Sequence, residues 1–165
     1  MTAEKIIEML DLKPLPGEGG YYSETWKSAG KIEISGLPGT YTSSRSFSTC
    51  IYYLLTPDSF SALHALPTEE IWHFYLGDPI EQLQLFPDGS GKVVEIGNNI
   101  SAGQIPQVVV PKCVWQCSKL KKGGKFALVG TTMSPGFEFE DYLPGIKDEL
   151  LQKYPDFAKL IEQLI

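Results

Sequence analysis

Residues 64–77 read HALPTEEIWHFYLG, and this stretch decides how the fold is interpreted. Its second half has the aromatic and β-branched composition of a strand. Because strand side chains alternate between two faces, Glu70 and Trp72 share one face and His73 points to the other. The stretch therefore predicts a strand that carries a carboxylate and an indole on one face, with His64 shortly before it.

Strand-like segments of this kind recur along the chain at short, regular spacing. They are residues 20–27, 47–55, 59–66, 71–76, 81–86, 92–96, 107–110, 114–120, 125–132 and 137–141. Turn sequences such as PDG at 87–89 and KGG at 122–124 separate them. Many short strands with frequent turns are typical of an all-β sandwich or barrel. Residues 30–41 lack strand character and are expected to form a loop or hairpin.

Helical spacing occurs only at the two ends of the chain. At the start, Thr2 precedes the apolar pattern as a plausible N-cap, and near the end Pro155 interrupts the pattern. No linker or internal repeat divides the sequence. We expect one domain over residues 1–165, with a short helix at about 2–11, a β-barrel at about 19–142 and a helical tail at about 146–165.

The composition excludes several classes of protein. The 165 residues are 42% hydrophobic and 21% charged, which is ordinary for a globular domain, and the formal net charge is −6. No basic stripe favours nucleic acid. No apolar run has the length of a membrane helix, and no signal peptide is visible. Three cysteines, an odd number, are expected of a reducing compartment. We therefore expect a cytoplasmic protein with neither a nucleic acid nor a membrane partner.

Two segments resemble the paired motifs of the cupin superfamily. In the first motif, two histidines one residue apart precede a glutamate, and a glycine follows; here His64, Glu70 and Gly77 match, but Leu66 occupies the second histidine position. The second motif, proline–x–glycine–x–x–histidine, is similar to residues 111–116 (PKCVWQ), where Cys113 and Gln116 replace the glycine and the histidine. The resemblance implies a double-stranded β-helix, also called a jelly-roll barrel.

A closer resemblance, to the fifth cupin subfamily, covers nearly the whole chain. The matching segments are residues 14–16, 18–22, 45–49, 51–55, 70–75, 77–79, 106–111 and 135–141. Membership of this subfamily, whose functions are largely unassigned, implies a cupin barrel and a homodimer. The aromatic N-terminal strand segment, with Tyr21, Tyr22 and Trp26, also offers an edge on which a second subunit can pair.

The motif positions define the candidate site. His64 and Glu70 are the candidate catalytic residues, and Arg45, Trp72, Trp115 and Gln116 are the candidate ligand-binding residues. His64, Glu70 and Gln116 would also be the ligands of a metal, if one binds, because imidazole and carboxylate suit divalent ions. The alternatives are structural: His64 and Glu70 pair in a packed core, Arg45 forms an ion pair, and Trp115 belongs to the core.

Three functions follow from these residues. The first is a non-redox enzyme of the isomerase or epimerase kind that acts on a sugar-like or acidic metabolite, because an imidazole and a carboxylate can abstract and return a proton. The second is a non-catalytic module that binds or senses a small ligand. The third is a metal-dependent oxygenase, which the loss of two ligand histidines disfavours. We expect no cofactor, with a divalent metal as the alternative.

Overall fold

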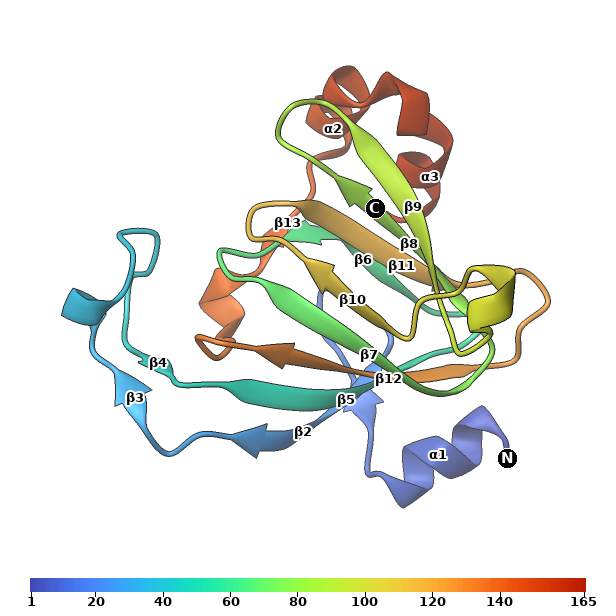
Figure 1. Cartoon of the computed structure of the whole chain (residues 1–165), viewed down its shortest axis with the longest axis horizontal. Coiled ribbons are helices and arrows are strands. Elements are labelled where there is room, and N and C mark those ends of the chain that lie inside the picture. Colours follow the sequence, from blue (N-terminus) through green and yellow to red (C-terminus); the bar gives the residue numbers. More distant parts are fainter.

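The computed structural model describes all residues 1–165, and most of the chain forms two antiparallel sheets that face each other (Figure 1). The first sheet has the order β1 (Lys13–Pro14), β2 (Tyr21–Lys27), β5 (Thr49–Leu55), β12 (Ala127–Met133), β7 (Glu70–Gly77), β10 (Gln107–Val110). The second has the order β13 (Leu143–Pro144), β6 (Phe60–Ala65), β11 (Trp115–Leu120), β8 (Ile80–Leu85), β9 (Gly91–Ile96). Neighbouring strands are mostly not consecutive in the chain, as in a jelly roll. The predicted all-β, double-stranded β-helix is confirmed.

The inner faces of the sheets form a barrel that is polar at one end and apolar at the other. On β11 the inward residues run from Gln116 through Ser118 to Leu120. Opposite them on the antiparallel strand β8 lie Gln84, Gln82 and Ile80, in that order. The apolar end is closed by packed Ile, Leu and Val side chains from both sheets. The polar side chains are therefore the ones that a ligand inside the barrel can meet.

Short helices cover the outer faces of the sheets. The N-terminal helix α1 (Ala3–Met9), capped by the Thr2 hydroxyl, buries Ile6 against Leu54 and Leu128 of the first sheet. At the other end, α2 (Lys147–Lys153) and α3 (Ala158–Gln163) flank η4 (Pro155–Phe157), so Pro155 interrupts the tail as expected. None of these helices has the length and apolarity that a membrane crossing requires.

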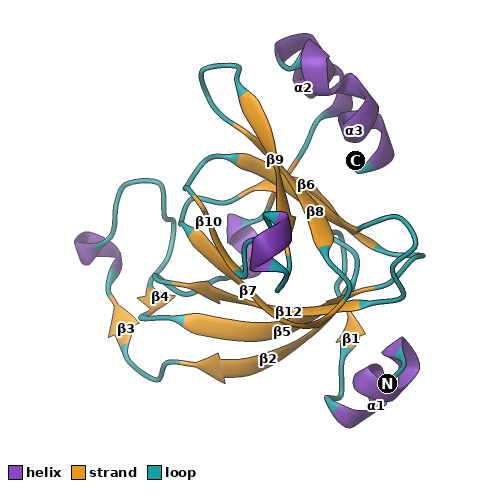
Figure 2. Cartoon of the chain, turned by 45° about the vertical axis from the view of Figure 1, so that its right-hand side comes forward, coloured by secondary structure: helices purple, strands orange, loops and turns teal.

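The two C-terminal helices seal the outer face of the second sheet (Figures 1 and 2). Leu150 and Ile161 pack with Leu83, Leu85 and Cys117, which β8 and β11 turn away from the barrel interior. Burial of each leucine or isoleucine side chain contributes about 1.5–3 kcal/mol, so these short helices are held by tertiary packing.

An arm protrudes from the barrel between β2 and β5 (Figure 2). It contains β3 (Lys31–Ile32), η1 (Ile34–Gly36) and β4 (Arg45–Ser46), and β3 pairs with β4 to close it as a hairpin. The loop-or-hairpin expectation for residues 30–41 thus resolves as a hairpin with a 3-10 turn.

The strand predicted at residues 137–141 was wrong. Phe139–Asp141 form a 3-10 turn, η3, and another such turn, η2 (Ile100–Ala102), follows β9. A capping box explains η3: the side chain of Glu138 accepts from the backbone of Asp141, and Asp141 accepts from the backbone of Glu138. This turn replaces a strand and places Phe137, Glu138 and Phe139 at the polar end of the barrel.

Candidate functional site

A cavity of about 230 Å³ opens at the polar end of the barrel. Its wall combines the inner face of the first sheet with the turn before β2 and the segment around η3. The lining residues are Leu15, Glu18, Tyr22, Glu24, Lys27, Thr49, Ile51, Leu66, Glu70, Thr131, Met133, Phe137, Glu138 and Phe139. Half of them are hydrophobic, so the cavity offers apolar surface together with a few polar groups, as small-molecule sites do.

Glu70, the first residue of β7, is held in place by its neighbours in the barrel. Its side chain is 7% exposed, and its Oε2 accepts hydrogen bonds from Trp72 Nε1 at 3.0 Å and Gln116 Nε2 at 2.7 Å. Trp72 Nε1 also donates to Gln116 Oε1 at 3.1 Å, which closes a triangle of three side chains. Oε1 receives none of these hydrogen bonds. Glu70 lines the cavity, so a ligand there can meet its carboxyl group.

The pKa of Glu70 is raised above its ordinary value. Burial is the main cause, and the negative charge of Glu18 adds to it; the charge of His64 and hydrogen bonding from Thr131 and Gln116 act in the opposite direction. A raised carboxyl pKa lies closer to neutrality, where a group can both take up and release a proton.

His64 lies beside this carboxylate but does not line the cavity. On β6 it is the cross-strand partner of Gln116, and its ring stacks on Tyr142 with centroids 5.1 Å apart. Its Nδ1–H donates to the Ala62 carbonyl at 2.7 Å, because a carbonyl oxygen can only accept. The imidazole is thus oriented by the chain, and it acts on Glu70 through its charge.

Glu18 is a site residue that the sequence interpretation did not select. It lines the cavity, and its Oε1 accepts a hydrogen bond from Ser61 at 2.7 Å. The following residue, Gly19, has φ +95°, and an added Cβ would lie 2.4 Å from the Phe60 carbonyl oxygen. Only glycine allows this close passage against β6. In the sequence, the feature that could have identified Glu18 is its position directly before a pair of glycines.

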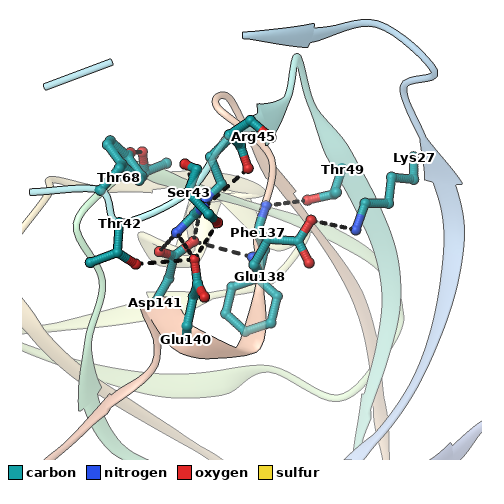
Figure 3. A network of polar contacts seen from close by, with 12 residues as sticks. Lys27, Thr42, Ser43, Arg45, Thr49, Thr68, Phe137, Glu138, Glu140 and Asp141 are labelled. Atoms are coloured by element: carbon teal, nitrogen blue, oxygen red, sulfur yellow. Dashed lines mark hydrogen bonds and ion pairs between the residues drawn. The ribbon is translucent and has the colours of Figure 1, made fainter. Parts of the chain in front are cut away.

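Arg45 is not in the cavity, which corrects its expected position beside Glu70. It is 1% exposed and forms a bidentate pair with Asp141, with Nε–Oδ2 at 3.0 Å and Nη2–Oδ1 at 2.6 Å (Figure 3). Its Nη2 also lies 2.8 Å from an oxygen of Glu140. Arg45 therefore fastens the base of the arm to η3, and its charge is already matched.

The two tryptophans have different places from those expected. Trp115 precedes the inward Gln116 on β11, so it points outward, where it packs against the C-terminal helices. It is therefore not on the cavity side. Trp72 does share a face with Glu70, as expected, but it is covered and holds the carboxylate instead of lining the cavity. The aromatic lining comes from Tyr22, Phe137 and Phe139.

His73 points to the outer face of the first sheet, as strand alternation predicted. Its ring nitrogens lie 3.1 Å from the Thr132 hydroxyl and 3.2 Å from the Gln107 amide, and burial lowers its pKa. It takes no part in the cavity.

The residues present do not fit a tightly held divalent metal. No three His, Cys, Asp or Glu side chains form a cluster. Gln116, the third ligand proposed from the sequence, uses its amide oxygen to accept from Trp72 and its amide nitrogen to donate to Glu70. Leu66 lines the cavity where a second histidine would be needed. One imidazole and a carboxylate do not make a metal site of the kind that this fold can carry, and we derive no step through a metal.

Comparison with known proteins identifies relatives of this chain. The family model described as Cupin superfamily (DUF985) matches residues 4–143. An uncharacterised protein of Saccharomyces cerevisiae, YML079W, is 35% identical over 143 residues, which are 81% of this chain and 71% of the yeast protein. The structure of a hypothetical protein from Leishmania major superimposes with a TM-score of 0.88 at 32% identity and covers 99% of this chain and 98% of that one.

A more distant structure shares the fold alone. Oxalate decarboxylase from Bacillus subtilis, a protein with Mn(II) centres, matches with a TM-score of 0.54 at 13% identity, over 94% of this chain and 38% of that one. The fold can thus carry a divalent metal. The more similar relatives are named uncharacterised or hypothetical and assign no reaction. The barrel, the motif residues and the family match agree, and the chain belongs to the fifth cupin family, described as Cupin superfamily (DUF985).

Proposed function

We propose that the barrel cavity binds a small metabolite and that Glu70 moves a proton in a non-redox reaction of the isomerase or epimerase kind. The carboxyl of Glu70 carries this proposal: it is almost fully buried, lies on the cavity wall and is held by Trp72 and Gln116 through one oxygen. A carboxyl fixed in this way can present its other oxygen to a bound C–H or O–H group without reorientation.

The proposed chemistry is a proton removed and returned next to a carbonyl. Glu70, with its raised pKa, takes the proton as a base and gives it back as an acid. Glu18 lines the same cavity and supplies a second carboxyl. His64 does not line the cavity, so it does not contact the ligand in this scheme.

A non-catalytic binding module is the second candidate. One observation favours it: the imidazole expected to act as a base does not line the cavity. Under this alternative the same wall would bind the ligand, and Glu70 would accept a hydrogen bond from it without transferring a proton.

The experiment begins with a thermal-shift screen of small metabolites against the wild type, Glu70→Gln and Glu69→Gln. Glu69 is the exposed neighbour of Glu70 and provides a matched control. Compounds that stabilise the wild type and the control, but not Glu70→Gln, are ligands of the cavity. Absence of any compound with this pattern would contradict the proposal.

The second step separates catalysis from binding. Each hit is incubated with protein in D2O, and the loss of C–H signals is followed by proton NMR. A base that abstracts a carbon-bound proton exchanges it with solvent, so the wild type and Glu69→Gln should incorporate deuterium and Glu70→Gln should not. Binding without exchange would select the non-catalytic module.

We also propose a cytoplasmic location. Its support is that Cys50, Cys113 and Cys117 are all free thiols. Fractionation of cells that express the tagged chain tests it, and recovery outside the cytoplasm would contradict it.

A further inference from the structure

The charges around the cavity are strongly one-sided. Four carboxylates line it, those of Glu18, Glu24, Glu70 and Glu138, and the only cationic lining side chain is Lys27. Glu70 and Glu18 lie on the inner wall, and Glu24 lies in the exposed part of β2 near the opening. A ligand in this cavity therefore meets a negative potential.

The one lysine of the lining already forms an ion pair. Lys27 Nζ lies 2.6 Å from Glu138 Oε1 across the opening, as the dashed line in Figure 3 marks. Arg45, the other nearby cation, is paired with Asp141 and Glu140. No guanidinium or ammonium is left to bind a carboxylate or phosphate of a ligand. An anion here would meet Glu18 and Glu70, and the charge that opposes theirs, that of His64, lies outside the lining.

Most of the other lining side chains are apolar or aromatic and suit the apolar part of a small ligand. Tyr22 and Ile51 project from neighbouring strands, and Phe137 and Phe139 lie at the rim with ring centroids 5.4 Å apart. Aromatic faces attract cations as well as apolar groups. Aromatic rings around carboxylates are a combination that recognises organic ammonium ions.

We infer that the cavity selects a small organic ligand with a positively charged nitrogen. Glu18 binds this nitrogen at the inner wall, close to the carboxyl of Glu70, while an apolar body lies against Tyr22, Ile51 and Phe137. This inference rests on the proposed function, since it names the ligand class of the same cavity. The inferred ligand is an amine, whereas the sequence favoured a sugar-like or acidic metabolite. An ammonium group supplies three donors to two carboxylates and relieves the repulsion between them.

The test uses matched trios of compounds that share a body and differ in charge. Benzylamine, benzyl alcohol and benzoate form one trio; 3-methylbutylamine, 3-methylbutanol and 3-methylbutanoate form another. Dissociation constants are measured by calorimetry at neutral pH and low salt. We expect each amine to bind at least about 10-fold more tightly than its alcohol, and the carboxylate to bind most weakly, because a near charge pair in a partly buried site is worth more than about 1.4 kcal/mol.

Three variants show whether the preference comes from this cavity. Glu70→Gln and Glu18→Gln should each weaken amine binding about 10-fold and leave alcohol binding nearly unchanged, since each removes one charge and keeps the shape. Glu69→Gln should leave both unchanged. Circular dichroism confirms the fold of each variant, and Glu18→Gln, at a half-buried position, keeps the test informative if Glu70→Gln is unstable.

The outcomes separate this inference from the function on which it rests. Alcohols or carboxylates that bind as tightly as the amines, with Glu70-dependent binding, would overturn the preference for cations and leave the cavity as a ligand site. Amine binding that none of the cavity variants changes would overturn the inference as well. A metabolite screen without any Glu70-dependent ligand would overturn the proposed function itself.

Discussion

Glu70 and Arg45 are the two most deeply buried groups of opposite charge near the barrel opening, and they have different partners. Glu70 is held mainly by neutral donors, from Trp72 and Gln116. Arg45 is held by two carboxylates, those of Asp141 and Glu140. A carboxylate with neutral partners keeps much of its desolvation penalty. A guanidinium that is fully paired with carboxylates holds together the segments that carry them. The two residues therefore respond differently to substitution.

Glu70 should make stability depend on pH. A carboxyl whose pKa is higher in the folded than in the unfolded protein binds its proton more tightly when folded. Its contribution to the free energy of unfolding is therefore most favourable below the ordinary carboxyl range and is lost as pH rises through the raised pKa. Glu70→Gln lacks this titration, so the variant should gain stability relative to the wild type as pH rises from the ordinary carboxyl range through the raised pKa.

Urea unfolding of both proteins across this range measures the effect, with Glu69→Gln as the control. A difference in unfolding free energy that stays constant with pH, or that moves in favour of the wild type as pH rises, would contradict a raised pKa of Glu70.

Arg45 should be required for stability. Arg45→Met leaves Asp141 as a buried, uncompensated charge, which costs about 3–5 kcal/mol. Lys27→Met breaks a pair whose members are both more than one-third exposed, so it should cost about 0–1 kcal/mol. Urea melts compare the two. Equal effects of the two substitutions would contradict the structural role of Arg45.

At the scale of elements, the barrel and its C-terminal helices depend on each other. The strands β8 and β11 turn Leu83, Leu85 and Cys117 outward, and α2 and α3 bury them. The second sheet therefore does not have one buried face and one solvent-exposed face. Where the helices lie, both of its faces are buried.

Two cysteines, Cys117 on β11 and Cys113 just before it, should show whether the C-terminal helices protect the second sheet from solvent. Burial raises the pKa of the Cys117 thiol to about 12, whereas Cys113 is exposed in the turn before the strand. A thiol reagent at pH 8 should modify Cys113 rapidly and Cys117 only after unfolding in urea, since the thiolate is the reactive form. Mass spectrometry of the labelled peptides identifies the site. Rapid labelling of Cys117 in the native protein would mean that the helices open readily.

At the scale of the whole molecule, the first sheet has a free edge. β1 pairs only with Tyr21 and Tyr22, so the remainder of β2 has no partner on the side away from β5. Trp26, 53% exposed, lies on this stretch. An unpaired strand edge with exposed aromatic surface is an assembly site, and we propose that two copies pair there as a homodimer.

Light scattering at micromolar concentration should give twice the chain mass of 18.3 kDa. Trp26→Lys should shift the mass toward the monomer, because charge on an edge strand opposes pairing. Val93→Lys, at an equally exposed apolar position on β9, should not. A wild-type monomer, or an equal effect of both substitutions, would remove the proposal.

Much of the fold could be predicted from local pattern. The resemblance to the paired cupin motifs brought Glu70 and Gln116 together. Period-two alternation located nine of the ten predicted strands, and Thr2 and Pro155 marked helix boundaries. These features depend on residues near one another in sequence, or on a register that strand alternation restricts to one face.

Only the tertiary structure decided what depends on distant partners. Arg45 binds Asp141, 96 residues away, and the strand expected there is a 3-10 turn that the pair and a capping box hold. Glu18 enters the cavity because a glycine turn passes against β6. Alternation states which face a side chain takes, but not which strand or loop lies opposite. The charge balance of the cavity is therefore a property of the folded barrel, since it depends on which cations are already paired.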